Sequence, residues 1–146
     1  MFYEQPTGVW TDGSGVNLVT GCLAGNNLIG EDMNNPASQF IHDHGPLPQG
    51  VYTIGPLKLQ PAVHSLGCVL TPDPANNMGE PPRGGFFLHL RNLNHVAPDG
   101  TNASSDGCIT FKSYADLAAI GRRVADGEKE MIVVAVLPDF STKGDT

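Results

Sequence analysis

The chain has 146 residues, which is enough for one hydrophobic core and too few for a second independent one. Hydrophobic residues make up 40% of it and charged residues 16%, so a folded body is expected and intrinsic disorder is excluded. The formal net charge of −7, with no cluster of lysine and arginine, argues against nucleic acid as a partner.

Turn-forming residues divide the first part of the chain into short segments, as in Asp12-Gly13, Asn35-Pro36 and Gly45-Pro46. The segments between such turns are rich in β-branched, aromatic and leucine residues, which favours strands. The expected strands cover residues 16–19, 51–54, 64–70 and 86–90.

A single helix is expected after residue 113. Ser113 can cap it, with Asp116 as the capping-box partner, and Gly127 is placed to end it. Leu117, Ile120 and Val124 recur at helical spacing. The apolar run 131–137 then predicts a last strand buried on both faces and ended by Pro138. We therefore expect a mostly β fold with one main α-helix, in a single domain 1–146 with a core of about 15–137 and a polar tail 138–146.

No segment predicts membrane insertion or export by a leader. An apolar stretch of roughly 20 residues would be needed to span a bilayer, and none is present. The N-terminus also lacks the basic and then apolar order of a signal peptide. We expect a chain made in the cytoplasm.

Ser105, Asp106, Gly107 and Cys108 form the most informative run of the sequence. A lone cysteine is most often an inert core thiol, but polar, turn-forming residues before Cys108 are typical of a reactive one. The glycine lets a substrate backbone come close, and the N–H groups of Gly107 and Cys108 can meet an oxyanion. The odd cysteine count leaves at least one free thiol, and pairing of the other two, Cys22 and Cys68, stays open.

His89 lies 16 residues before Ser105 within the expected strand 86–90, where neighbouring strands can bring it to the thiol. An isolated strand histidine is usually structural, so the two candidates support each other. A carbonyl such as that of Leu90 can accept from the far ring nitrogen and fix the tautomer.

Three motifs occur in a known order: Gly45-Pro46-Leu47-Pro48-Gln49-Gly50-Val51-Tyr52, then His89, then Ser105-Asp106-Gly107-Cys108-Ile109. Over residues 15–137 this order resembles the L,D-transpeptidase (YkuD-like) catalytic domain. With Asn34-Asn35-Pro36 it is most similar to the small L,D-transpeptidase effectors of type VI secretion.

The resemblance implies a β-sandwich of mixed sheets and a cysteine acyltransferase that acts on peptidoglycan tetrapeptide stems through a thioester. Cys108 would be the nucleophile and His89 the base, without a cofactor or metal. The reaction would be cross-linking, D-amino-acid exchange or L,D-carboxypeptidase cleavage. The chain would be secreted to the target-cell periplasm, with an immunity protein and a secretion component as possible partners.

Two positions depart from the family pattern. Asp106 stands where the family commonly has histidine, and Thr110 where it commonly has arginine. A carboxylate close to the thiol would raise its pKa. Arg91 or Arg83 can replace the missing cation. The further expected substrate-binding residues are Leu90, Tyr52 and His44.

Other interpretations stay open. The departures favour a non-catalytic wall-binding or structural module, and a cysteine peptidase of another bond is a third reading. His42-Asp43-His44 has the spacing of a metal pair, but no further ligand has a recognisable spacing, so a solvated turn or a groove flank is expected.

Overall fold

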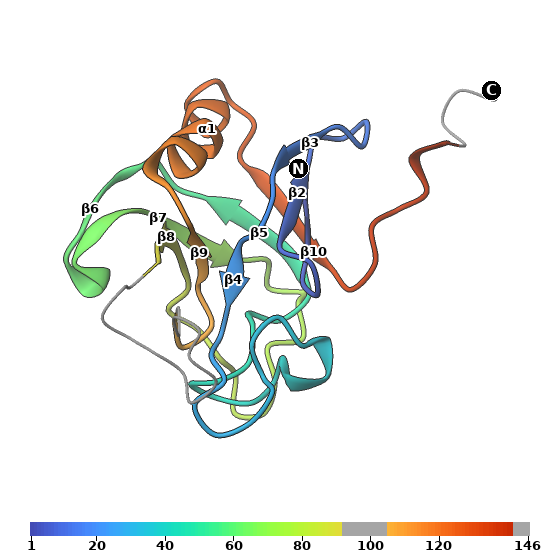
Figure 1. The fold of residues 1–146 in the computed structure, drawn as a ribbon, viewed down its shortest axis with the longest axis vertical. Helices are drawn as coiled ribbons and strands as arrows, with labels where there is room; N and C mark the ends of the chain where they lie inside the picture. The colour runs from blue at the N-terminus through green and yellow to red at the C-terminus, as the bar shows by residue number, and fades with distance from the viewer. Residues whose placement is uncertain (92–104, 142–146) are drawn as a thin grey trace.

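The computed structural model describes residues 1–91 and 105–141 as a mostly β body with one α-helix in this part of the chain (Figure 1). In chain order the strands and helices are β1 Phe2–Glu4, β2 Val9–Thr11, β3 Asn17–Val19, β4 Leu23–Ala24, the 3-10 helix η1 Pro36–Ser38, β5 Gly50–Ile54, β6 Lys58–Gln60, the 3-10 helix η2 Pro61–Val63, β7 Ser65–Pro72, β8 Phe87–Leu90, β9 Ile109–Phe111, α1 Tyr114–Ala125 and β10 Glu130–Val134.

The strands follow one mixed path, β3-β2-β1-β10-β5-β7-β8-β9-β4, with β6 paired to β7. The long strand β7 connects two halves of it, because residues 70–72 pair with β5 whereas residues 67–69 pair with β8. Two pairs are parallel, β1 with β10 and β8 with β9. The expectation of a mixed β architecture with one main helix after the cysteine is therefore confirmed.

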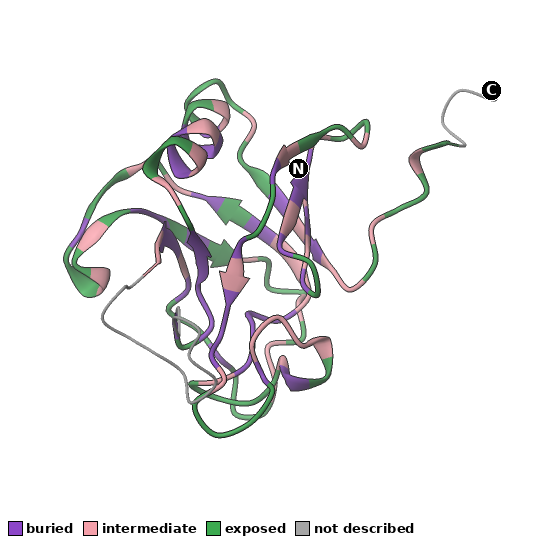
Figure 2. Cartoon of the chain, in the orientation of Figure 1, coloured by how far each residue is buried: buried purple, intermediate pink, exposed green. Residues whose placement is uncertain are grey.

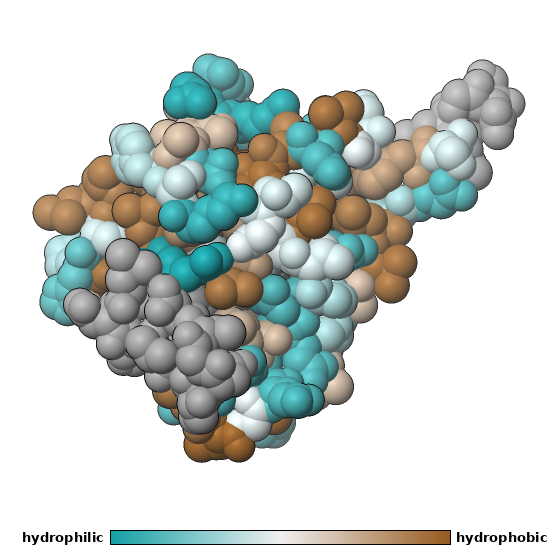
Figure 3. All heavy atoms as spheres, in the orientation of Figure 1, coloured by the Kyte–Doolittle hydropathy of each residue, from teal (hydrophilic) through white to brown (hydrophobic). Residues whose placement is uncertain are grey.

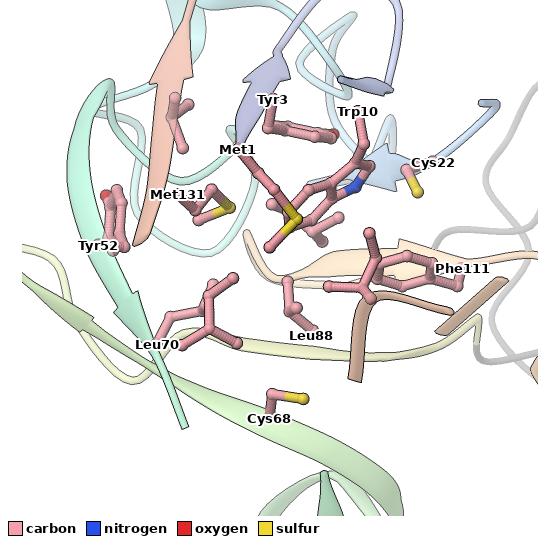
Figure 4. Close-up of a cluster of buried hydrophobic side chains, with 14 of the residues drawn as sticks. Met1, Tyr3, Trp10, Cys22, Tyr52, Cys68, Leu70, Leu88, Phe111 and Met131 are labelled. Atoms are coloured by element: carbon pink, nitrogen blue, oxygen red, sulfur yellow. The ribbon is translucent and has the colours of Figure 1, made fainter. Parts of the chain in front are cut away.

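Large side chains from both halves fill the interior. Figure 4 shows Tyr3, Trp10, Phe111, Leu88 and Met131 facing one another, and all five are fully buried. Burial of this apolar area, at about 25 cal/mol per Å², is the main stabilising term. Since Tyr3 and Trp10 come from β1 and β2, the folded core includes residues ahead of position 15.

Helix α1 covers β3, β8 and β9 at one end of the body (Figure 1). The Ser113 side chain accepts from the N–H of Asp116 at 3.2 Å and so caps the helix as expected. Leu117, Ile120 and Val124 are buried on the face toward the strands (Figure 2). The helix follows β9, the short strand after the thiol, and packs on β8 and β9.

The last strand is shorter than expected. β10 ends at Val134, and in it the buried Met131 and Val133 alternate with exposed or half-buried residues, so the expectation of a strand buried on both faces to residue 137 is wrong. Val136 is 77% exposed. The apolar run continues past the point where β1 and β5 offer partners, which ends the strand before Pro138.

Apolar side chains also lie on the surface. Leu59 of β6 and Leu66 of β7 face each other across the hairpin, and both are exposed. Figure 3 shows brown side chains gathered on the side of the molecule where this hairpin lies.

Candidate active site

A pocket of about 260 Å³ opens beside Cys108. Three segments line it: residues 42–43, residues 82–86, and residues 106 and 108. The first two are loops, and the third is the turn that leads into β9. Cys108 is 8% exposed, so its thiol is buried in the wall of the pocket but not sealed from it.

The Cys108 sulfur has two backbone neighbours at the start of β8. It accepts a hydrogen bond from the N–H of Phe87 at 3.3 Å, and its own proton is directed to the carbonyl of Gly85 at 3.9 Å. Burial raises the pKa of Cys108 to about 11, although the Phe87 N–H opposes the rise. The thiol is therefore protonated near neutral pH and needs a base to react.

Ser105 holds the turn before the thiol. Its hydroxyl donates to the carbonyl of Cys108 at 2.6 Å and accepts from the N–H groups of Gly25 and Gly107 at 3.2 Å each. The Gly107 N–H is thus already engaged, which corrects the expectation that it meets an oxyanion.

Gly107 is required for internal packing. Its φ is +145°, and a Cβ there would lie 2.6 Å from Arg83 Nη2 and 2.6 Å from Phe86 Cε1. The space beside the glycine is therefore filled by side chains. This finding corrects the expectation that the glycine admits a substrate backbone.

His89 makes the backbone contact expected of it. Its Nδ1 lies 2.7 Å from the carbonyl oxygen of Leu90, which can only accept, so the neutral ring carries its proton on Nδ1. Nε2 is then the nitrogen that can take a proton. Burial lowers the pKa of His89 below its ordinary value of 6.5, so the ring is neutral near pH 7.

His89 lies on β8, and Cys108 directly precedes β9, the strand that pairs with β8. His89 is opposite Thr110 in the parallel register of β8 and β9, so Cys108 is level with Phe87. Alternation along the strands directs both side chains to the same face. The sulfur is turned toward Phe87 and Gly85, however, and within residues 1–91 and 105–141 no hydrogen bond joins it to the ring.

Asp106 and Thr110, the two departures from the family pattern, have different settings. Asp106 is exposed, lines the pocket and raises the pKa of Cys108 further. Thr110 is fully buried, and its hydroxyl donates to the carbonyl of Leu23 at 2.8 Å, joining β9 to β4. Thr110 therefore has a structural role away from the pocket.

Arg83, not Arg91, brings a cation to the pocket wall. Arg83 is 6% exposed, and its two terminal nitrogens donate to four carbonyl oxygens. Arg91 is not among the residues that line the pocket; it donates to the carbonyl of Gly21 at 2.8 Å, and its Nε is buried without a partner in the described residues.

The remaining expected substrate contacts are not met. Tyr52 is fully buried and donates to the carbonyl of Pro48 at 2.7 Å, so it stiffens the Gly-Pro-x-Pro turn, and the expectation that it binds substrate is wrong. Leu90 packs against the core and acts through its carbonyl. The His44 ring contacts the side-chain oxygen of Asn26, and the Asn26 amide donates to the carbonyl of Ser105. His44 therefore supports the turn of residues 105–108, here called the thiol turn, through Asn26.

All three cysteines, which lie in the described residues, are free thiols. Figure 4 shows Cys22 beside Trp10 and Cys68 at the opposite side of the core. Burial raises their pKa values to about 12 and about 11. Only Cys108 of the three lines the pocket.

The sequence indicated less clearly that residues 42–43 and Arg83 line the pocket. The run Pro81-Pro82-Arg83-Gly84-Gly85 reads as a turn before a strand, and nothing local shows what its arginine binds. The acceptors of Arg83 lie in segments brought to it only by folding. His95, in the sequence region before Ser105, lies outside the described residues.

No group of three histidine, cysteine or acidic side chains within residues 1–91 and 105–141 is arranged to hold a metal ion. Over the same residues, no helix has the length and apolar character to cross a bilayer. Comparisons with protein-family models, curated proteins and solved structures find no match to this chain. Its function is therefore inferred from the sequence motifs and the geometry of the site.

Proposed function

We propose that the protein is a peptidoglycan-modifying cysteine acyltransferase of the L,D-transpeptidase type, with tetrapeptide stems as substrate. The observation that carries the proposal is a thiol in the wall of an open pocket, with a backbone N–H at 3.3 Å from its sulfur. The order of motifs in the sequence and the mixed β fold with a helix after the thiol support the same class.

Neutral Cys108 and neutral His89 define how the reaction would start. The sulfur turns from Phe87 toward His89 by rotation about the Cα–Cβ bond, and its proton passes to Nε2. The thiolate then attacks the carbonyl of the third stem residue, and the Cys108 N–H donates to the oxyanion.

Collapse of that intermediate would break the bond to the terminal D-alanine, whose nitrogen takes the proton from His89. The stem remains on Cys108 as a thioester. An amine of another stem then gives a cross-link, a free D-amino acid gives an exchanged stem, and water gives a shortened stem. In an attacking effector, the last two outcomes would block normal cross-linking.

The sequence resemblance also supports a biological setting. We propose that the chain is an antibacterial effector, secreted by a type VI system to the periplasm of a target cell. A cognate immunity protein and a component of the secretion apparatus would be its partners. Co-purification of a neighbouring open reading frame's product with the protein tests the first of these.

The test uses purified muropeptides with tetrapeptide stems and reads loss of D-alanine by mass. Wild-type protein is expected to shorten or exchange the stems and to yield an acyl adduct on Cys108. Cys108→Ala and His89→Ala are expected to abolish both, whereas Cys68→Ala, which removes a thiol outside the pocket, keeps them. Unchanged stems with folded wild-type protein would contradict the proposal.

A non-catalytic wall-binding module is the second candidate. The observations that favour it are the thiol pKa of about 11 and the carboxylate of Asp106 in the pocket. In this case the protein sediments with purified sacculi, Cys108→Ala binds equally well, and no adduct forms.

A further inference from the structure

We infer that Arg83 is a positioning residue for the thiol: it holds the loops around the pocket together and supplies a fixed positive charge beside Cys108. The inference rests on the proposed function only in taking the Cys108 thiolate as the reacting species.

Four hydrogen bonds fix the guanidinium. Nη1 donates to the carbonyls of Gln39 at 2.6 Å and Pro46 at 2.8 Å, and Nη2 donates to those of Gly45 at 3.1 Å and Asp106 at 2.8 Å. These acceptors belong to the η1 loop, the Gly-Pro-x-Pro turn and the thiol turn. One planar group therefore sets the mutual positions of three separate segments.

The charge of Arg83 is buried without an ion pair. The residue is 6% exposed, its guanidinium carbon lies 5.2 Å from the centre of the Phe86 ring, and within residues 1–91 and 105–141 no carboxylate oxygen is within 4.0 Å of it. A buried cation that is only solvated by carbonyls attracts any anion that forms nearby. The anion that chemistry would create at this pocket is the Cys108 thiolate.

Other charged groups also face the thiol. Asp43 and Asp106 line the same pocket and oppose a negative sulfur, and His42 lines it too. Tyr52 lies close to Arg83 on the core side, where burial raises the pKa of its hydroxyl so that it stays neutral. Arg83 also lowers the pKa of Cys108. Among the pocket-lining residues it is the one permanent cation that offsets the two aspartates.

The experiment compares how fast an anionic and a neutral reagent alkylate Cys108. Iodoacetate and iodoacetamide react with the same thiolate, so the ratio of their rates cancels the thiolate fraction and the exposure of the sulfur. That ratio reports local charge, which a purely structural arginine would not change. Rates are read by peptide mass spectrometry at about pH 8, where a buried thiol still reacts through its minor thiolate.

Arg83→Met is expected to lower the iodoacetate-to-iodoacetamide ratio at least about threefold, whereas Arg83→Lys keeps it within about twofold, since the charge remains. Arg122→Met, an exposed helix position with the same loss of charge, serves as the control and leaves the ratio unchanged. Arg83→Lys still loses the paired hydrogen bonds of the planar guanidinium. Hydrogen exchange of the Leu47 amide, which donates to the Gly107 carbonyl at 3.0 Å, is therefore expected to accelerate.

An unchanged ratio in folded Arg83→Met overturns the inference. If that variant does not fold, Arg83→Gln and then Arg83→Ala replace it and are judged by the same ratio. The result is separate from the proposed function. Wild-type protein that shortens stems with an Arg83-independent ratio refutes only the inference, and an inert wild type with an Arg83-dependent ratio refutes only the proposed function.

Discussion

Gly107 shows how tightly the thiol turn is specified at the level of one residue. Its φ of +145° and the 2.6 Å approaches to Arg83 and Phe86 leave no place for a side chain. Gly107→Ala is expected to destabilise the fold by about 3 kcal/mol, from backbone strain together with the displaced arginine, and to abolish activity. Urea unfolding gives the first value and the muropeptide assay the second.

Gly84→Ala is the matched control for stability. A Cβ at Gly84 would meet nothing within 4 Å, although the residue lies in the same pocket wall. Its unfolding midpoint is expected to stay close to that of wild type. Equal effects of the two substitutions would mean that the Gly107 contacts are not what holds the turn.

His89 determines the expected pH dependence. Burial holds the pKa of His89 below 6.5 and raises the pKa of the Cys108 thiol to about 11. Near neutral pH both the imidazole and the thiol are therefore uncharged. We expect kcat/KM to rise with pH through the His89 pKa and then to stay level up to about pH 9. A bell-shaped profile, which falls again at alkaline pH as an imidazolium loses its proton, would instead indicate a thiolate–imidazolium pair and contradict this assignment.

The same histidine links pH to stability. The unfolded ring, with its ordinary pKa near 6.5, binds a proton more readily than the buried one. The free energy of unfolding is therefore expected to fall as pH drops below that value, and His89→Gln to reduce this slope. Urea unfolding of both proteins at a series of pH values measures it.

For single residues, the sequence indicated the candidates for chemistry but not what surrounds them. Cys108 and His89 stand out because polar, turn-forming residues precede the thiol and an expected strand holds the histidine, and the contact of His89 with the Leu90 carbonyl was among the expected ones. Arg83 gave no comparable signal, since its partners Gln39 and Pro46 are far from it in sequence. Tyr52 was misassigned because a motif residue can be retained for packing.

Helix α1 is the element whose start the sequence defines best. Ser113 accepts from Asp116 N–H, which is half of the expected capping box. Ser113→Ala is expected to destabilise the fold by about 1 kcal/mol, whereas Ser113→Asp, which keeps an acceptor, has little effect. Since α1 packs on β8 and β9, the alanine variant tests whether the cap also supports the thiol, read as Cys108 alkylation.

How well the sequence predicted a strand depended on the length of that strand. β5, β7 and β8 were predictable because turns bound them and their patterns run over four or more residues. The strands β1, β2, β4 and β9 have two or three residues, too few for a period of two to show. β10 was extended too far because apolar character continues past Val134, where pairing partners end.

For the whole molecule, β10 is the strand that closes the structure. It lies between β1, in parallel, and β5, in antiparallel order, and places Met131 and Val133 in the core. A chain that ends at Gly127 is expected not to fold, since it exposes two strand edges and loses that packing. Circular dichroism and protease resistance measure this outcome.

A chain that ends at Ser141 is the control, because it keeps every described element. It is expected to melt close to the full-length protein. If the chain ending at Gly127 were protease resistant, the central place of β10 would not be what stabilises the body.

The central position of β10 also has a consequence for biosynthesis. Ribosomes deliver this strand after all the others that the structure describes, so the gap beside β1 stays open until residue 134 has left the exit tunnel. Nascent chains cannot finish folding before this point. Interrupted translation products expose unpaired strand edges, through which they can aggregate. A producing cell would therefore hold a finished thiol site only in molecules whose synthesis has passed that point.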